Sequence, residues 1–437
     1  MQIGEKTLTI QSMTPRAVVR TGKATAIEAY LGQTELSGDM VPARISTGTI
    51  DLKGVLNSTG LTGEAHANAI AISDIRDDPV YQPLLADFTA DFREGGMVLT
   101  GPIKTARSKV TVADARMELD LLKLDGNASI ISRPLVFEER GFQPTALSDR
   151  IRGFLSNARG KLEGRADFEI SGGSLAGTGR VEATDFGFDT VRVGGVDGVN
   201  GVINFNNLLS LSTPPGQEVR IGSINPGIAL SDGLLVFQLI DGREAQIELA
   251  RWPFAGGTIL VEPTRWTVAG TSDVIRVRAE QLELTQLIDI LSIPDLKADG
   301  TVSGAFPLEL VGTSAFIRDA RLTADEEGGT IKYTGAIAQQ AGSADQRVKY
   351  AFDALRDFRF SVLEVGANGN LSGDILVTVK LSGLSPEVLG GAPFEFNIGV
   401  DSKLMQLVQS GRRLATSDWI TDVVTDEITK NRKPESE

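Results

Sequence analysis

The sequence has no cysteine and a single histidine, His66, among its 437 residues. Without cysteine the chain can form no disulfide and no thiolate metal site, and it has no cysteine nucleophile. A Ser-His-Asp triad would have to use His66, but local spacing places no serine or carboxylate beside it, and no G-x-S-x-G motif occurs. Because His66 alternates with alanines in "GEAHANAIAI", we expect it on the solvated side of a strand. The sequence therefore indicates a protein that is not an enzyme, with no cofactor and no metal site.

Basic residues are also scarce, with 43 Lys and Arg against 57 Asp and Glu, which gives a net charge of -14. No basic patch is localised enough to attract nucleic acid, so nucleic-acid binding is not expected. Long apolar runs are absent too, since the longest, "GLLVFQLI" (233–240), is the length of a strand and not of a transmembrane helix. The first residues, "MQIGEKTLTIQ", lack the order of a signal peptide and are typical of the middle of a strand. We expect the natural N-terminus to lie upstream.

Glycine is abundant, with 48 residues, whereas aromatic residues make up only 6% of the chain. Many turns and few bulky core residues favour a protein made mainly of β-sheet. Segments with alternating apolar and polar residues predict half-buried strands at 115–124, 161–170, 245–249 and 374–381. Turn-forming pairs predict tight hairpins between sequential antiparallel strands, at Asp125-Gly126, Asp197-Gly198, Asn200-Gly201, Asp232-Gly233, Asp241-Gly242, Asp299-Gly300 and Asn368-Gly369.

Helical patterns are few and short. Apolar residues at helical spacing predict helices over 145–158, 284–291 and 348–355, and two amphipathic C-terminal helices within 403–430 before a polar tail at 431–437. We expect one elongated, repetitive β-groove over 1–437, divided into an N-terminal β segment (1–144), a groove region (145–402), the C-terminal helices and the tail.

Two further motifs are weak. "GSLAGTGRVE" (173–182) has Glu182 where a dinucleotide fingerprint needs its third glycine, and "TADEEGG" (323–329) lacks the spacing of a calcium loop. We interpret the first as a strand bulge or turn and the second as a charged turn.

The apolar faces of the strands raise the main functional question. They could pack on a second sheet, as in a β-sandwich, or line an open groove. Helices able to cover the sheet are few, and aromatic residues that fill sandwich cores are scarce, but the two alternatives stay open on these grounds.

From about Gly160 onward a series of phrases, in this order, resembles the YdbH family of AsmA-like bacterial envelope proteins, which are relatives of TamB. The phrases are "GRADFEISGGSLAGTGRVEATDFGF", "VNGVINFNNLLSLSTPPGQ", "INPGIALSDGLLVFQL", "WPFAGGTILVEP", "DGTVSGAFPLEL", "GGTIKYTG", "AFDALRDFRFSVLEV" and "LSGLSPEVLGGAPFEFNI". Residues 1 to about 140 have the style of this group without assignable phrases.

The resemblance implies a long antiparallel β-sheet curved into an open trough, which carries phospholipid through the periplasm between the inner and outer membranes. It also implies an N-terminal inner-membrane anchor, which is missing from this chain, and a small outer-membrane lipoprotein as a partner that adds a strand. We expect ten residues to line the groove that holds the acyl chains: Leu162, Ala166, Phe168, Ile170, Ile247, Leu249, Ile375, Val377, Val379 and Leu381. An outer-membrane or surface structural β protein and a soluble β-sandwich carrier of small molecules are the alternative functions.

Overall fold

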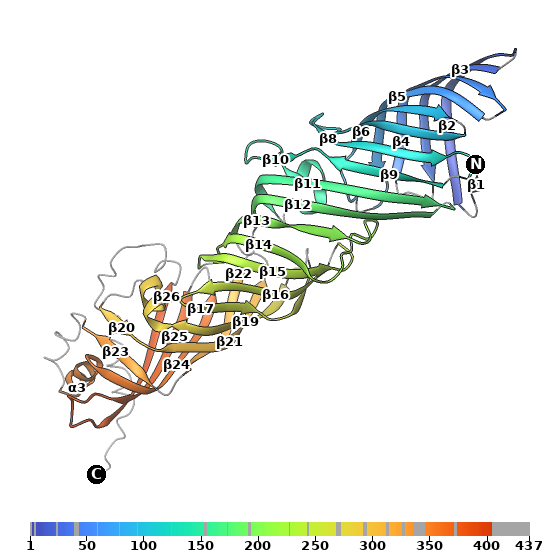
Figure 1. The fold of residues 1–437 in the computed structure, drawn as a ribbon. Coiled ribbons are helices and arrows are strands. Elements are labelled where there is room, and N and C mark those ends of the chain that lie inside the picture. Colours follow the sequence, from blue (N-terminus) through green and yellow to red (C-terminus); the bar gives the residue numbers. More distant parts are fainter. Residues whose placement is uncertain are drawn as a thin grey trace, which may run out of the picture. The chain divides into compact units, whose positions relative to one another are not determined.

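The structure is a computed structural model that describes residues 2–403, apart from gaps at 4–5, 23–24, 39–42, 59, 78, 94, 124, 153–154, 173, 191–193, 227, 243, 268–271, 292–294, 312–313, 326–327, 335–345 and 371–373. Strands dominate this part of the chain, and sequential strands run side by side (Figure 1). The prediction of a mainly β, open antiparallel sheet is therefore confirmed.

The strands and helices follow one another in this order: β1 (Gln2–Ile3), β2 (Lys6–Arg20), β3 (Thr25–Gly38), β4 (Ala43–Asn57), β5 (Gly60–Asp74), β6 (Leu84–Arg93), β7 (Gly96–Thr105), β8 (Thr111–Asp120), β9 (Asp125–Ser132), β10 (Leu135–Phe137), η1 (Pro144–Ala146), η2 (Asp149–Ile151), β11 (Ser156–Ser171), β12 (Ser174–Thr190), β13 (Gly194–Phe205), β14 (Gln217–Ile224), β15 (Leu230–Leu239), β16 (Glu244–Phe254), β17 (Gly257–Val261), β18 (Thr264–Thr267), β19 (Ser272–Glu283), α1 (Leu284–Leu291), β20 (Leu296–Ala298), β21 (Thr301–Val311), β22 (Ser314–Ala324), β23 (Gly329–Tyr333), α3 (Gln346–Leu355), β24 (Phe358–Asn370), β25 (Asp374–Leu384) and β26 (Pro393–Lys403).

The chain divides into two compact units. Unit 1 comprises Met1–Thr190, Asp197–Arg220 and Phe237–Ala245, and unit 2 comprises Val191–Val196, Ile221–Val236 and Gln246–Glu437. In unit 1, β2 to β9, then β11 and β12, each pair antiparallel with the next. In unit 2, antiparallel pairing links β16, β17, β19, β21, β22, β24, β25 and β26 in that order.

Two of the predicted helices are confirmed, since α1 covers 284–291 and α3 covers 348–355. The helix predicted over 145–158 is wrong. Among the described residues of this range only the single 3₁₀ turns η1 and η2 form, and β11 begins at Ser156, because Leu147 and Leu155 pack on a sheet in separate clusters and not along one helical face. The C-terminal helices predicted within 403–430 and the tail lie outside the described residues, apart from Lys403 at the end of β26.

Several predicted hairpin turns are also wrong, because their Asx-Gly pairs lie inside strands. Asn200 is in β13 and Asn368 in β24, where each side-chain oxygen accepts the backbone N–H of a bulged residue in another strand. The bulged residues, Asp185 and Asp319, both have a left-handed φ of 47°. The same arrangement recurs at Ala69, whose N–H is bound by the Asp87 carboxylate at 3.0 Å.

These bulges have a structural consequence. A bulge bends its strand and increases the local twist, which curves a sheet. At Ala69, Asp185 and Asp319 the bulged residue is exposed and the next residue is buried, so the bulge also returns the apolar side chains to one face. Of the remaining pairs, Asp241-Gly242 lies in the connection between β15 and β16, as predicted. Asp299-Gly300 also lies between strands, but it joins β20 to β21, and β20 pairs with β23 whereas β21 pairs with β19 and β22, so the hairpin predicted there is wrong.

Unit 2 has a closed hydrophobic core at one part of its sheet. Helices α1 and α3 bring Leu284 and Ala354 onto a cluster with Phe358, Phe360 and other buried residues of β19 to β25. Phe358 has no exposed surface, and its ring meets that of Phe396 edge to face, with centroids 5.2 Å apart. Helices therefore cover this part of the sheet, as they do in an ordinary layered protein.

Candidate functional site

The most extensive feature of unit 1 is one apolar face of its sheet. Directly opposite residues of antiparallel strands point to the same side, so the pairing register shows which side chains share a face. One continuous row of apolar and small residues crosses all ten strands from β2 to β12 (β10 lies outside this row); its members are Ala17, Ala29, Leu52, Ala65, Ala90, Leu99, Met117, Ala128, Phe168 and Gly177. We call this the central row.

A second row runs beside the central row, two residues away in each strand. It contains Val19, Ile27, Gly54, Gly63, Phe92, Met97, Leu119, Gly126, Ile170 and Leu175. No charged residue interrupts either row. Together the two rows define what we call the apolar face.

The large side chains of the central row are half-buried, as Leu52, Leu99, Met117 and Phe168 show. A sheet face packed under a second layer would bury such residues, because packed interiors leave few voids. Their neighbours on the apolar face shield them in part, and the remaining surface is open to solvent. The apolar face of unit 1 is therefore not the inside of a sandwich at these positions.

The opposite face of the same strands is charged. Arg165 and Asp167 form an ion pair of 2.7 Å on β11, and Arg116 and Glu118 form one of 2.5 Å on β8. The alternation of 161–170 is thus confirmed as one strand with a polar and an apolar side. Exposed pairs of this kind add little stability, but they keep one face soluble.

Glycines on the apolar face make room for larger neighbours. The Phe168 ring lies over Gly177, where a Cβ atom would be 2.7 Å from the nearest ring carbon. Gly177 and Gly179, which lie in the segment 173–182, are therefore strand residues that accommodate Phe168 and Leu208, and not parts of a bulge or turn.

A strip of side chains beside the apolar face is covered by another segment of the chain. Residues 138–152, which we call the strap, follow β10 and contain η1 and η2. Phe142 and Leu147 of the strap pack on a cluster formed by Ile103, Val112 and Ala113. Phe142 also stacks on Phe137, which is 2% exposed, with ring centroids 5.6 Å apart.

Hydrogen bonds hold the strap at two places. Gln143 exchanges two bonds of 2.9 Å with the backbone of Ala158 at the start of β11. On the other side Gln82 donates its backbone N–H to the Leu147 carbonyl at 2.7 Å, and its side-chain amide to the Asp149 carboxylate.

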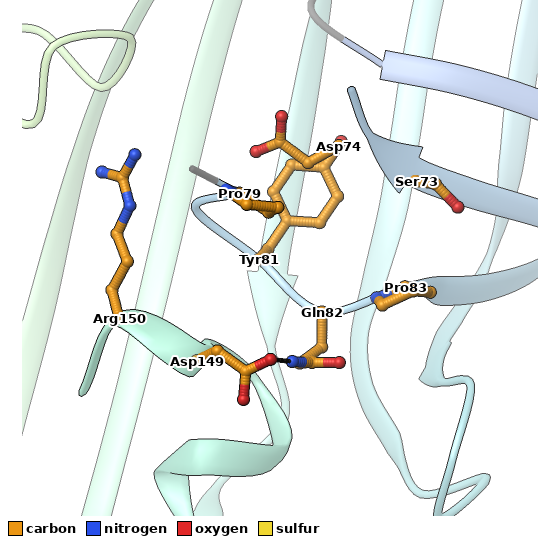
Figure 2. A pocket seen from close by; sticks show the side chains of 8 residues that line it. All are labelled: Ser73, Asp74, Pro79, Tyr81, Gln82, Pro83, Asp149 and Arg150. Atoms are coloured by element: carbon orange, nitrogen blue, oxygen red, sulfur yellow. Dashed lines mark hydrogen bonds between the residues drawn. The ribbon is translucent and has the colours of Figure 1, made fainter. Parts of the chain in front are cut away.

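A pocket of 270 Å³ lies at this second contact, lined by Ser73, Asp74, Pro79, Tyr81, Gln82, Pro83, Asp149 and Arg150 (Figure 2). The side chain of Asp74 is inaccessible to solvent and forms a 2.7 Å ion pair with Arg76. Burial alone would raise the pKa of Asp74, but hydrogen bonds from Arg76 and from the backbone of Val80 lower it to about 2. The carboxylate thus holds Arg76 and Val80 in place and is not free for catalysis.

The predicted lining residues are distributed over both units. Ala166 lies beside the two rows on the apolar face, Phe168 and Ile170 belong to them, and all three are half-buried. Leu162 is half-buried and packs against the covered cluster that contains Phe137. Sequence reasoning missed Leu52, Leu99 and their neighbours, although "TIDLKGVL" (49–56) alternates in the same way as 161–170.

In unit 2, Ile247 and Leu249 are half-buried on β16. The four predicted residues of β25 share one face, as predicted, but Ile375 and Leu381 are only 2% and 3% exposed and belong to closed clusters. Val377 and Val379 are half-buried and pack against those clusters.

His66 is half-exposed on the polar side of β5, as expected. Contrary to the expectation from local spacing, the Glu64 carboxylate lies 3.1 Å from its Nε2 atom. Within the described part of the chain, His, Asp and Glu side chains form no group of three or more that could hold a metal ion. No helix among these residues is long and apolar enough to span a membrane.

Comparisons with known proteins identify the family of this chain. No curated protein and no solved structure matches the chain. The model of the YdbH-like family, described as intermembrane phospholipid transport protein YdbH, matches residues 1–427, so the similarity extends over the N-terminal region in which no phrase could be assigned. The chain therefore belongs to the YdbH-like family of intermembrane phospholipid transport proteins.

Proposed function

We propose that this chain carries phospholipid by holding the acyl chains against the apolar face of unit 1, while the head group stays in water. The observation that supports the proposal most directly is the central row, which is apolar or small at every position across ten strands and yet half-open at its large side chains. The family's substrate class is phospholipid, which has the amphipathic character that such a face requires.

The energetics explain why a continuous face is needed. Exposing an acyl chain to water costs about 0.8 kcal/mol per CH₂ group, or on the order of 12 kcal/mol for a 16-carbon chain. A lipid that moves along an unbroken apolar row keeps its tails shielded at each step. A single charged residue in the row would restore part of that cost.

The dimensions are also suitable. Neighbouring strands lie about 4.8 Å apart, so a row across ten strands extends roughly 45 Å. One leaflet of a bilayer core is about 15 Å thick, which is the depth that the tails of one lipid occupy. The row is therefore long enough to hold more than one lipid in succession.

This mechanism makes and breaks no covalent bond, and the residues of the apolar face carry no group that could serve as an acid, base or nucleophile. We therefore propose a transport role without enzymatic activity. A soluble β-sandwich carrier would bury the apolar face, which is half-open in unit 1, and no observation favours a structural protein of the outer membrane.

We further propose that the chain works in the periplasm, as part of one groove-shaped body that is anchored in the inner membrane by a segment preceding this sequence. A small outer-membrane lipoprotein could join by adding a strand to an open sheet edge, since unpaired edges accept strands from other chains. The family's intermembrane role supports this location.

Photocrosslinking tests the proposal directly. A photoreactive amino acid at Phe168 should crosslink to bound phospholipid, and the same group at Thr178, which belongs to the opposite side of the β11–β12 pair, should not. Native mass spectrometry of the purified chain should show co-purifying phospholipid. Equal crosslinking at both positions, or no bound lipid in either experiment, would contradict the proposal.

A further inference from the structure

The strap covers a strip that continues the apolar face. Ala115 and Ile130 are directly paired on β8 and β9, two residues before Met117 and two after Ala128 of the central row. Because side chains two residues apart in a strand point to the same side, the covered strip and the central row belong to one surface. Ala115 and Ile130 both pack against the cluster on which Phe142 and Leu147 of the strap lie.

The covering side chains resemble the proposed ligand. Phe142 and Leu147 place apolar groups on Ile103, Val112 and Ala113, a surface with the same composition as the open rows. In the absence of lipid, this contact keeps an otherwise exposed strip out of water. An acyl chain bound to the strip would shield it from water in the same way.

The strap is held mainly by side-chain packing and has few regular hydrogen bonds. It contains only the 3₁₀ turns η1 and η2, and residues 138–141 at its start are exposed. Gln143 bonds the backbone of Ala158 at one side of the strap, and Gln82 bonds Leu147 and Asp149 at the other. The side chains of Gln82 and Asp149 line the pocket shown in Figure 2. Segments with few regular hydrogen bonds open more readily than the strands around them.

We infer that the strap is a displaceable cover, and that the strip beneath it, centred on Ile103, Ala113 and Ile130, is a further acyl-chain-binding stretch that opens when lipid is present. The inference rests on the proposed function. It adds to that function a site that is closed in the empty protein and a contact, Gln82 to Asp149, that controls access to it.

The absence of cysteine from the chain permits a clean test. In a Gln82→Cys/Asp149→Cys variant, a bifunctional methanethiosulfonate reagent joins only these two positions, and a reductant releases them. The control is Arg116→Cys/Ser129→Cys, a directly opposite pair on the polar face of β8 and β9. Loading of a fluorescent phospholipid from phosphatidylglycerol vesicles is measured before and after reduction, together with lipid photocrosslinking from a reactive group at Ile130.

When the strap is joined, we expect lipid crosslinking at Ile130 to fall at least tenfold, and we expect reduction to restore it. In the control variant neither joining nor reduction should change this crosslinking. In addition, a single Leu147→Cys variant should react faster with a maleimide when lipid is added. Equal crosslinking at Ile130 in the joined and reduced forms, or an unchanged maleimide rate, would overturn the displaceable cover while leaving lipid binding at Phe168 intact. Loss of crosslinking at Phe168 in the reduced and unmodified proteins would instead refute the proposed function.

Discussion

Replacing Met117 with aspartate should block lipid movement at the middle of the central row. Met117 is half-buried between Leu99 and Ala128, its direct neighbours in the row. In the empty protein an aspartate at this position stays hydrated, because the face is open, and the cost to folding is about 1 kcal/mol of strand preference. Each passing acyl chain, however, would have to remove water from the carboxylate, because the aspartate side chain is too short to move its charge out of the lipid path.

The cost of that dehydration sets the size of the effect. An aspartate at the centre of a membrane helix costs about 2.5 to 3.5 kcal/mol. Each 1.4 kcal/mol corresponds to a factor of ten, so lipid transfer should slow by roughly 100-fold. Transfer of a fluorescent phospholipid between donor and acceptor vesicles measures this rate.

The matched control is Ser129→Asp on the polar face of β9, opposite Arg116. It introduces the same residue type in the adjacent strand, so it has a similar strand-preference cost without placing charge in the lipid path. Circular dichroism and urea unfolding establish that both variants are folded. If the Met117→Asp protein transferred lipid at the rate of the control, acyl chains would not pass over the central row.

Three further predictions concern stability, each measured by urea unfolding. The Asp74 carboxyl has a pKa of about 2 in the folded protein against an ordinary value of 3.8, so its stabilising effect of about 2 kcal/mol is present above pH 4 and is lost as the pH falls to 2. Asp74→Asn should flatten this part of the curve of unfolding free energy against pH. An unchanged curve would contradict the ion pair. Gly304→Ala should destabilise the protein by about 1–3 kcal/mol or more, because the new Cβ atom would lie 2.0 Å from a backbone carbonyl oxygen. Gly399→Ala should be neutral or slightly stabilising, because no atom lies within 4 Å of the new Cβ. Equal effects of the two substitutions would refute the close backbone approach at Gly304. Phe358→Ala should lower the free energy of unfolding by about 3–5 kcal/mol, whereas Val362→Ala, which changes an exposed side chain, should lower it by less than about 0.5 kcal/mol. A small effect at Phe358 would show that the cluster around Phe358 is not a closed core.

Alternation of side chains made the strands predictable. The segments 161–170 and 374–381 each carry one polar and one apolar side, and both are strands with those sides separated. A strand pattern depends only on the two faces of a pleated chain, so it can be read without knowledge of the fold. For the same reason the pattern does not say what an apolar face contacts.

Local signals failed where a residue acts on a distant part of the chain. The Asn in each of two Asn-Gly pairs bonds a bulged residue in another strand, 15 positions away for Asn200 and 49 for Asn368. The segment 145–158, which overlaps the end of the strap, was predicted as a helix because Leu147, Ile151 and Leu155 have helical spacing. Two of these side chains instead pack on separate clusters of the sheet, which only the pairing of β7 to β12 brings into place.

The two units show why the predicted lining residues fared differently. Unit 2 has a comparable row, which also contains no charged residue; its members are Trp252, Ile259, Ala279, Gly304, Leu322, Val365, Val379 and Ile398. There, however, α1, which follows β19 directly, and α3, which directly precedes β24, pack on the sheet, so Ala279 is buried and Leu381 beside the row belongs to the closed cluster. In unit 1 the strap is the segment that covers the strip at Ile103, and Phe168 and Met117 stay half-open. An apolar strand face is thus a candidate lipid surface only where no covering element is packed on it, and this makes Phe168 a stronger position for lipid contact than Leu381.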